Sequence, residues 1–197
     1  LYPHCHFYSV LIFLAMAILV SCSSKENGEV EKFINYQKPL SRSIDEKGLN
    51  KTDIRNAISK SEYTLFVKHN QEILKSYPVV LGPDPVNDKR MEGDGCTPEG
   101  IFGIRDKYPH RKWTRFIWLD YPNEDSWKKF KKAKADGKIP QDATIGGEVG
   151  IHGVPPGKDY WIDKGENWTL GCISLKNADI IELYDFVTSD MEICIHK

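Results

Sequence analysis

The chain has 197 residues, enough for one domain with a substantial core once any processed segment is removed. Lys and Arg number 27 against 28 Asp and Glu, so the net charge is -1. A balanced charge gives no positive field that would attract nucleic acid, and nucleic-acid binding is therefore not expected.

An uncharged apolar run, Val10 to Val20, lies near the N-terminus. It is too short to span a bilayer and has the length of the hydrophobic region of a signal peptide. It runs into Leu-Val-Ser-Cys at residues 19–22, which resembles the bacterial lipobox. We expect residues 1–21 to be a lipoprotein signal peptide and Cys22 to carry the lipid. A signal peptide cut elsewhere and a membrane helix are the alternatives, and the true start residue stays open.

Residues 22–61 are predicted to be a tether that ends in a short helix. Residues 23–50 are polar and charged without sustained periodicity, as in a linker between a lipid anchor and a domain. Thr52 then stands as a helix N-cap before the apolar residues Ile54, Ala57 and Ile58.

From residue 62 the sequence changes to short β-rich runs separated by turn residues, so we predict a folded domain at 62–197. Residues 62–82 alternate as two strands around a Lys-His-Asn-Gln turn, which predicts a hairpin. Further strands are expected at 100–106, 115–121, 147–153 and 191–197. This spacing favours a mostly antiparallel sheet or sandwich with few helices.

Two helices interrupt the strands. The first, residues 123–138, carries Trp127 and Phe130 three apart among six lysines, so it is expected to lie on the surface by a narrow apolar stripe, with its lysines on a solvated face. The second begins with Asn177 as the expected N-cap. Its apolar residues follow helical spacing and are assigned to the core: Ile180, Leu183, Tyr184 and Val187.

Three cysteines remain once Cys5 is removed and Cys22 is lipidated: Cys96, Cys172 and Cys194. An odd number in an exported protein raises the question of a reactive thiol. A Cys96–Cys194 disulfide and simple burial of both remain open. Cys172 follows Gly171 on a turn expected to lead into the second helix, which suits either a small buried side chain or a presented nucleophile.

A nucleophilic Cys172 needs a base, and His152 is the best placed histidine. It lies at the end of a predicted strand, between Gly150 and Gly153, where another backbone or a substrate could approach closely. The other histidines lie in the signal, in turns, in a loop or at the C-terminus. A lone histidine in such a place is more typical of a structural residue.

The combination resembles a known signature. His152, a gap of sixteen residues, and then Thr169, any residue, Gly171 and Cys172 resemble the pattern of YkuD-type L,D-transpeptidases. In that family a histidine precedes a Ser/Thr-His-Gly-Cys turn. Residues 77–104 resemble the family's early hairpin and its Gly-Asp-Gly…Thr-Pro-Glu-Gly turn, so the resemblance covers 62–196. It implies a mainly β fold, a YkuD-like β-sandwich or mixed sheet with a few short helices.

The resemblance also implies a reaction on peptidoglycan stem peptides. Cys172 would attack the carbonyl after the third stem residue, release D-alanine and pass the acyl group to an amine, giving 3-3 cross-links or an attached protein. His152 would be the base and the Gly153 carbonyl would orient it. Backbone N–H groups from Leu170 to Cys172 would face the oxyanion, with Thr169 and Gly171 in the same substrate-binding turn.

The implied setting is the bacterial envelope, with the protein facing the periplasm or the cell surface. Stem peptides are the expected partner, the lipid anchor would hold the protein at the membrane, and carbapenems are expected to acylate Cys172. No metal or cofactor is needed. Nearby N–H groups and an imidazolium are expected to lower the thiol pKa.

Two positions depart from the family pattern. Leu170 stands where the family has its motif histidine, two residues before the cysteine. Ser174 stands where the family often has Arg or Asn, two residues after the cysteine. Leu170 cannot donate a side-chain hydrogen bond, which favours considering a hydrolase, a peptidase or amidase, beside the transferase. A murein-binding lipoprotein without turnover is the third hypothesis. The acyl acceptor, membrane leaflet and oligomeric state stay open.

Other conspicuous residues have structural readings. The Gly-Asp-Gly turn is expected to shape a wall of the site, with Asp94 and Glu99 in structural roles. Trp161 and Trp168 flank the loop between His152 and Cys172, and the sequence does not separate cleft lining from packing.

Overall fold

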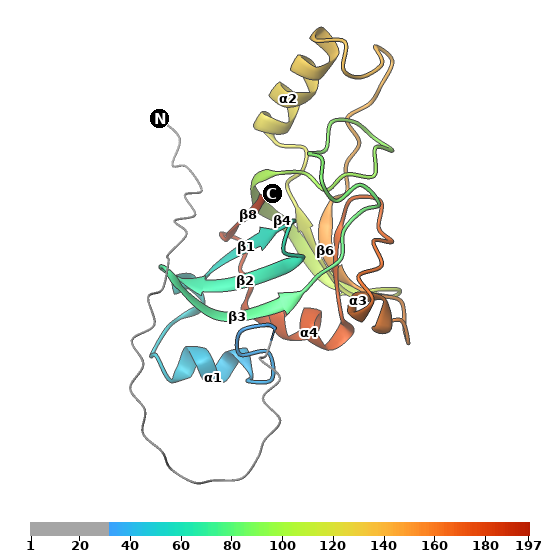
Figure 1. Cartoon of the computed structure of the whole chain (residues 1–197). Coiled ribbons are helices and arrows are strands. Elements are labelled where there is room, and N and C mark those ends of the chain that lie inside the picture. Colours follow the sequence, from blue (N-terminus) through green and yellow to red (C-terminus); the bar gives the residue numbers. More distant parts are fainter. Residues whose placement is uncertain (1–31) are drawn as a thin grey trace, which may run out of the picture. The chain divides into compact units, whose positions relative to one another are not determined.

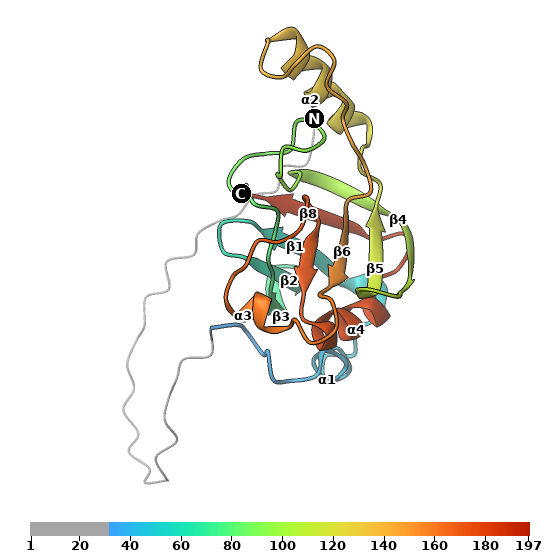
Figure 2. The ribbon, with the colours of Figure 1, turned by 90° about the vertical axis from the view of Figure 1, so that its right-hand side faces the viewer.

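The computed structural model describes residues 32–197, which fold around one sheet of eight strands (Figures 1 and 2). The predicted signal peptide and Cys22 lie outside the described residues. Among the helices that the structure does describe, none combines the length and the apolar character that a bilayer crossing requires.

The helices of this unit are α1 (Leu40–Asp45), the 3-10 helix η1 (Lys51–Asp53), α2 (Glu124–Ala135), α3 (Tyr160–Asp163) and α4 (Asn177–Phe186). The strands are β1 (Arg55–Ser59), β2 (Thr64–His69), β3 (Glu72–Pro78), β4 (Gly100–His110), β5 (Thr114–Leu119), β6 (Gly150–Gly153), β7 (Ile173–Leu175) and β8 (Glu192–His196). Their order in the sheet is β3-β2-β1-β8-β4-β5-β6-β7. The β1–β8 and β6–β7 pairs are parallel and the others are antiparallel. The predicted mainly β fold with a mixed sheet and short helices is confirmed.

The helix predicted after Thr52 is wrong. Thr52 lies in η1, and the residues after it form β1 between β2 and β8, so the sheet begins before residue 62. Ile54 and Ile58 are buried at strand spacing, and Asn56 between them is also buried, with its amide bonded to the sulfur of Met191. Because Asn56 is polar, it interrupts the alternation of apolar residues that indicates a strand, and Ile54, Ala57 and Ile58 remain at helical spacing.

The segment predicted as a free tether is folded from residue 33 onward. Leu40 in α1 is fully buried, and its N–H donates to the Glu182 carboxylate of α4 at 2.7 Å. Glu182 also accepts a hydrogen bond from the Tyr77 hydroxyl at 2.7 Å and pairs with Lys75 at 2.9 Å. One carboxylate therefore ties α1, α4 and β3 together. Low hydrophobicity along the segment concealed this docking.

The hairpin and the first of the two longer helices form as predicted. Asn70, with φ of 52°, makes the turn between β2 and β3. Asn123 caps α2 by accepting the Ser126 N–H at 3.1 Å. Phe130 is buried, but Trp127, which was expected on the same apolar stripe, is exposed. In both views α2 lies at the end of the unit away from α1 and α4 (Figures 1 and 2).

The start of α4 differs from the prediction. Lys176 is the N-cap and makes no side-chain cap, while Asn177 is the first helical residue. The Asn177 side chain instead accepts a hydrogen bond from the Thr114 hydroxyl at 2.6 Å. Asn177 was predicted from local capping preference, but here it serves a tertiary contact with β5. The predicted apolar stripe of α4 holds, since Ile180 and Leu183 are fully buried.

Candidate active site

Strand alternation decides which residues of β5, β6 and β7 face the site. Ile117, Ile151 and Ile173 are aligned across these strands and are buried in the main core. Their neighbours in sequence must face the opposite side. Phe116, His152 and Ser174 are aligned on that side.

Cys172 lies directly before β7, on the same side of the sheet as His152. The sequence placed it just ahead of a helix, but β7 separates it from α4. His152 is paired with Ser174, so Cys172 is its diagonal neighbour. With strands about 4.8 Å apart and a rise of about 3.3 Å per residue, such diagonal backbone positions are about 8 Å apart. Two side chains on the same face can span that distance.

His152 is held in one orientation. Its Nδ1 lies 2.7 Å from the Gly153 carbonyl oxygen, so Nδ1 carries the proton and donates it, and Nε2 is the unprotonated nitrogen. The Trp113 ring stacks on the imidazole at 4.4 Å, and Trp168 meets it edge-on at 5.5 Å. The side chain is 2% exposed. Gly153 must be glycine, because an added Cβ would lie 2.8 Å from the Trp113 carbonyl oxygen.

The turn before Cys172 is built on Thr169. The buried Thr169 hydroxyl accepts the Gly171 N–H at 3.2 Å and donates to the Cys172 carbonyl oxygen at 2.7 Å. The Gly171 N–H is therefore engaged within the turn, contrary to the expectation that it faces the substrate. The Leu170 side chain is 87% exposed and contributes no packing to the turn.

The loop that contains the Gly-Asp-Gly sequence, residues 93–95, lies against the turn before Cys172. Gly171 has φ of 129°, and a Cβ there would lie 2.6 Å from the Cys96 carbonyl oxygen and 3.8 Å from Nζ of Lys89. Lys89 is buried and pairs with Asp94 at 2.9 Å. Asp94 also accepts the Cys96 N–H at 3.0 Å, which agrees with the structural role expected for it. Glu99 likewise pairs with a buried lysine, Lys60, at 2.9 Å.

Burial shifts the pKa values of both central groups away from the charged forms. It raises the pKa of the Cys172 thiol to about 11, although the Gly150 N–H and the Lys89 charge act to lower it. It lowers the pKa of His152 to about 4, opposed by the hydrogen bond to Gly153. The expected lowering of the thiol pKa is therefore wrong. At neutral pH the thiol and the imidazole are both uncharged.

The remaining residues singled out in the sequence have definite places. Cys96 is a free thiol, so the Cys96–Cys194 disulfide is not formed. Trp168 both contacts His152 and packs on Trp161, beside a small apolar cluster that includes Val80. The Ser174 hydroxyl is fully buried and has no hydrogen-bond partner among the described residues. Within residues 32–197 no three His, Cys, Asp or Glu side chains are grouped as a metal site would require.

The sequence missed Trp113, Phe116 and Lys89. Trp113 and Phe116 come from β5 and the turn before it, and only strand register brings their rings onto His152. Lys89 lies in a polar segment of the sequence to which no function was assigned. A buried lysine has no local sequence signal, since its partner and its burial are both tertiary.

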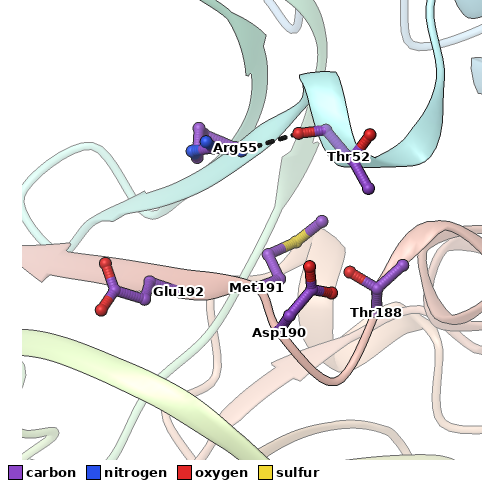
Figure 3. A pocket seen from close by; sticks show the side chains of 6 residues that line it. All are labelled: Thr52, Arg55, Thr188, Asp190, Met191 and Glu192. Atoms are coloured by element: carbon purple, nitrogen blue, oxygen red, sulfur yellow. Dashed lines mark hydrogen bonds between the residues drawn. The ribbon is translucent and has the colours of Figure 1, made fainter.

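Two pockets on the described surface can be compared with this site. One, of about 190 Å³, is lined by Thr52, Arg55, Thr188, Asp190, Met191 and Glu192 (Figure 3). It lies by β1 and β8, contains no cysteine or histidine, and is separated from β6 by β4 and β5 in the sheet. The other, of about 490 Å³, is lined by His110, Arg111, Lys112 and Trp113, and so adjoins the ring that covers His152.

Comparison with known proteins agrees with this geometry. Residues 55–195 match the family described as YkuD, L,D-transpeptidase catalytic domain. The helical cell shape determining protein Pgp2 from Campylobacter jejuni is 20% identical, with a TM-score of 0.52 over 80% of this chain and 55% of that one. Bd1075 from Bdellovibrio bacteriovorus is also 20% identical, with a TM-score of 0.50 over 73% of this chain and 48% of that one.

At this identity the two structures support the fold alone, and the chain spans about half the length of each. No curated protein sequence matches it. The family match covers most of the chain and includes both Cys172 and His152. The chain therefore belongs to the YkuD family of L,D-transpeptidase catalytic domains.

Proposed function

We propose that this protein is a peptidoglycan L,D-transpeptidase that uses Cys172 as nucleophile and His152 as base. The observation that carries the proposal is that His152 in β6 and Cys172, directly before β7, lie on the same side of the sheet, with His152 Nδ1 bonded to the Gly153 carbonyl oxygen. That bond leaves Nε2 free to accept a proton. The family match supports action on peptidoglycan in the cell envelope.

The first half of the reaction forms a thioester. The Cys172 sulfur attacks the carbonyl carbon after the third stem residue, while His152 Nε2 takes the thiol proton. The carbonyl oxygen becomes an oxyanion, for which the backbone N–H groups of Leu170 and Cys172 are the proposed donors. His152 then gives its proton to the departing amine, the C–N bond breaks, and D-alanine leaves.

The second half transfers the acyl group. An acceptor amine attacks the thioester carbon and loses a proton to His152, and collapse of the tetrahedral intermediate breaks the C–S bond. The sulfur regains the proton from His152, which restores the neutral pair. Because the thiol pKa is about 11 and the imidazole pKa about 4, the proton moves during attack rather than before it.

Water as acceptor would give a hydrolase with the same thioester. Leu170, which replaces the motif histidine, is exposed and has no polar atom in its side chain, and this favours keeping the hydrolase alternative. Incubation of the purified protein with disaccharide tetrapeptides separates the outcomes. Cross-linked dimer indicates transfer, shortened tripeptide indicates hydrolysis, and neither product indicates a murein-binding protein without turnover.

Thiol chemistry is tested with a carbapenem. We expect a one-to-one adduct on the peptide that contains Cys172, absent in Cys172→Ala and much slower in His152→Ala. Cys96→Ala is the matched control, because Cys96 is buried with a pKa raised to about 12. An adduct on Cys96, or full turnover by Cys172→Ala, would contradict the proposal.

Lipidation at Cys22 is proposed as the means of attachment to the membrane. It rests on the apolar run and the Leu-Val-Ser-Cys sequence before Ser23. Cys22→Ala should accumulate as an unprocessed or mis-sorted precursor in fractionated cells. Normal processing and wild-type fractionation of this variant would contradict the lipoprotein assignment.

A further inference from the structure

The pocket at the β4–β5 hairpin is positively charged and includes Trp113, the ring that stacks on His152. It is lined by His110, Arg111, Lys112 and Trp113, with a volume of about 490 Å³, and we call it the hairpin pocket. Arg111 and Lys112 are exposed, and neither forms an ion pair with any carboxylate of the described residues. No lining residue is acidic. The hairpin pocket therefore offers two uncompensated cations to a ligand.

His110 adds a third donor. Its Nδ1 accepts the N–H groups of Lys112 at 3.3 Å and Trp113 at 3.2 Å, so the proton of the neutral ring is on Nε2. Burial and the Lys112 charge lower the His110 pKa, which keeps the ring neutral at pH 7. A neutral N–H donor beside two cations suits an anion that accepts several hydrogen bonds, above all a carboxylate.

The hairpin pocket is fixed to the base by direct contacts. His110 stacks on Trp113 at 4.4 Å, and Trp113 stacks on His152 at 4.4 Å. The Trp113 carbonyl oxygen accepts the Gly153 N–H at 3.0 Å. Thr114, the next residue, has φ of 61°, which is rare for a β-branched side chain. Its hydroxyl bond to Asn177 holds the hairpin in this conformation.

The proposed reaction indicates which carboxylate would bind in the hairpin pocket. His152 must protonate the departing amine, so the leaving amino acid lies on the His152 side of the thioester carbon. In the leaving D-amino acid the carboxylate is attached to the carbon that bears this amine. Trp113 stacks on His152 and also lines the hairpin pocket with Arg111 and Lys112, so these two cations lie next to the ring that contacts the base.

We infer that the hairpin pocket binds the free C-terminal carboxylate of the peptide donor. This inference rests on the proposed function and deepens it, because it assigns the basis for choosing a peptide that ends at the residue to be released. A peptide whose C-terminus is amidated would lose the ion pairs and keep every other contact.

Binding tests the inference without any need for turnover. The protein would carry Cys172→Ala, and the dissociation constant would be measured for a disaccharide tetrapeptide and for the same compound with a C-terminal amide. The test variant adds Arg111→Gln and Lys112→Gln, which remove both charges. The matched control adds Lys158→Gln and Lys164→Gln, two lysines beside α3 that do not line the pocket.

We expect the test variant to bind the free acid about 5- to 20-fold more weakly, the size expected of partly exposed charge-assisted contacts. It should bind the amide as the unsubstituted protein does, and the control should match the unsubstituted protein for both ligands. Equal losses for acid and amide, no loss for either, or no binding of either ligand would overturn the inference. Failure of the proposed function would show separately, as normal binding without any product from the protein that retains Cys172.

Discussion

Replacing Gly171 with alanine tests whether the turn before Cys172 requires a residue without a Cβ atom. Gly171 has φ of 129°, and a Cβ would lie 2.6 Å from the Cys96 carbonyl oxygen. The backbone conformation costs an L-residue about 1–3 kcal/mol, and the forced contact adds about 1–3 kcal/mol. We expect Gly171→Ala to lower the free energy of unfolding by about 2–6 kcal/mol. It should also slow alkylation of Cys172 by iodoacetamide, because the thiol is on the next residue.

Two other glycines separate the two contributions. Gly157 has φ of 76° with no atom within 4 Å of a Cβ, so Gly157→Ala should cost about 1–2 kcal/mol from the backbone alone. Gly147 has neither a positive φ nor a nearby atom, and Gly147→Ala should stabilise the fold slightly, by at most about 1 kcal/mol. Urea unfolding followed by tryptophan fluorescence gives all three values. If Gly171→Ala loses no more stability than Gly157→Ala, the contact with the Cys96 carbonyl is not tight and the reasoning fails.

The same site gives four further expectations. Burial lowers the pKa of His152 in the folded state to about 4 from 6.5, so the free energy of unfolding keeps this contribution above pH 6.5 and loses it, by about 3 kcal/mol, as the pH falls towards 4. This pH-dependent loss should vanish in His152→Gln. Parallel acid unfolding of the two proteins would contradict the prediction. The rate of Cys172 alkylation should keep rising from pH 7 to 10, because the thiol pKa is about 11, and a plateau below pH 8 would exclude the neutral pair. Thr169→Val should cost about 1–3 kcal/mol and slow alkylation, since the Gly171 N–H loses its acceptor, and unchanged stability would show that the turn does not need the hydroxyl. Leu170→His should change stability by less than about 0.5 kcal/mol because the side chain is exposed, yet shift the ratio of transfer to hydrolysis; equal ratios would remove any role for this position.

Local patterns were sufficient wherever the deciding contacts are close in sequence. The β2–β3 hairpin and the apolar stripe of α4 follow from strand alternation and helical spacing. His152 and Cys172 were singled out from a spaced pattern, and the structure puts His152 in β6 and Cys172 directly before the neighbouring strand β7.

Tertiary contacts decided the rest. β1 was missed because the buried Asn56 broke the apolar alternation, and its partner β8 comes more than 130 residues later in the chain. The raised thiol pKa could not be anticipated from the turn sequence, because it follows from burial against segments far apart in sequence. The same holds for Trp113, whose place over His152 depends on the register between β5 and β6.

The position of β8 also constrains when this domain can fold. β8 lies between β1 and β4, near the middle of the sheet, and follows the other seven described strands in the sequence. Until Glu192–His196 are available, β1 to β3 and β4 to β7 can only form two separate partial sheets, each with an exposed edge. Pairings between residues so distant in sequence raise the contact order of the fold and slow its closure. The two partial sheets can therefore join into the eight-stranded sheet only after residues 192–196 have been synthesised.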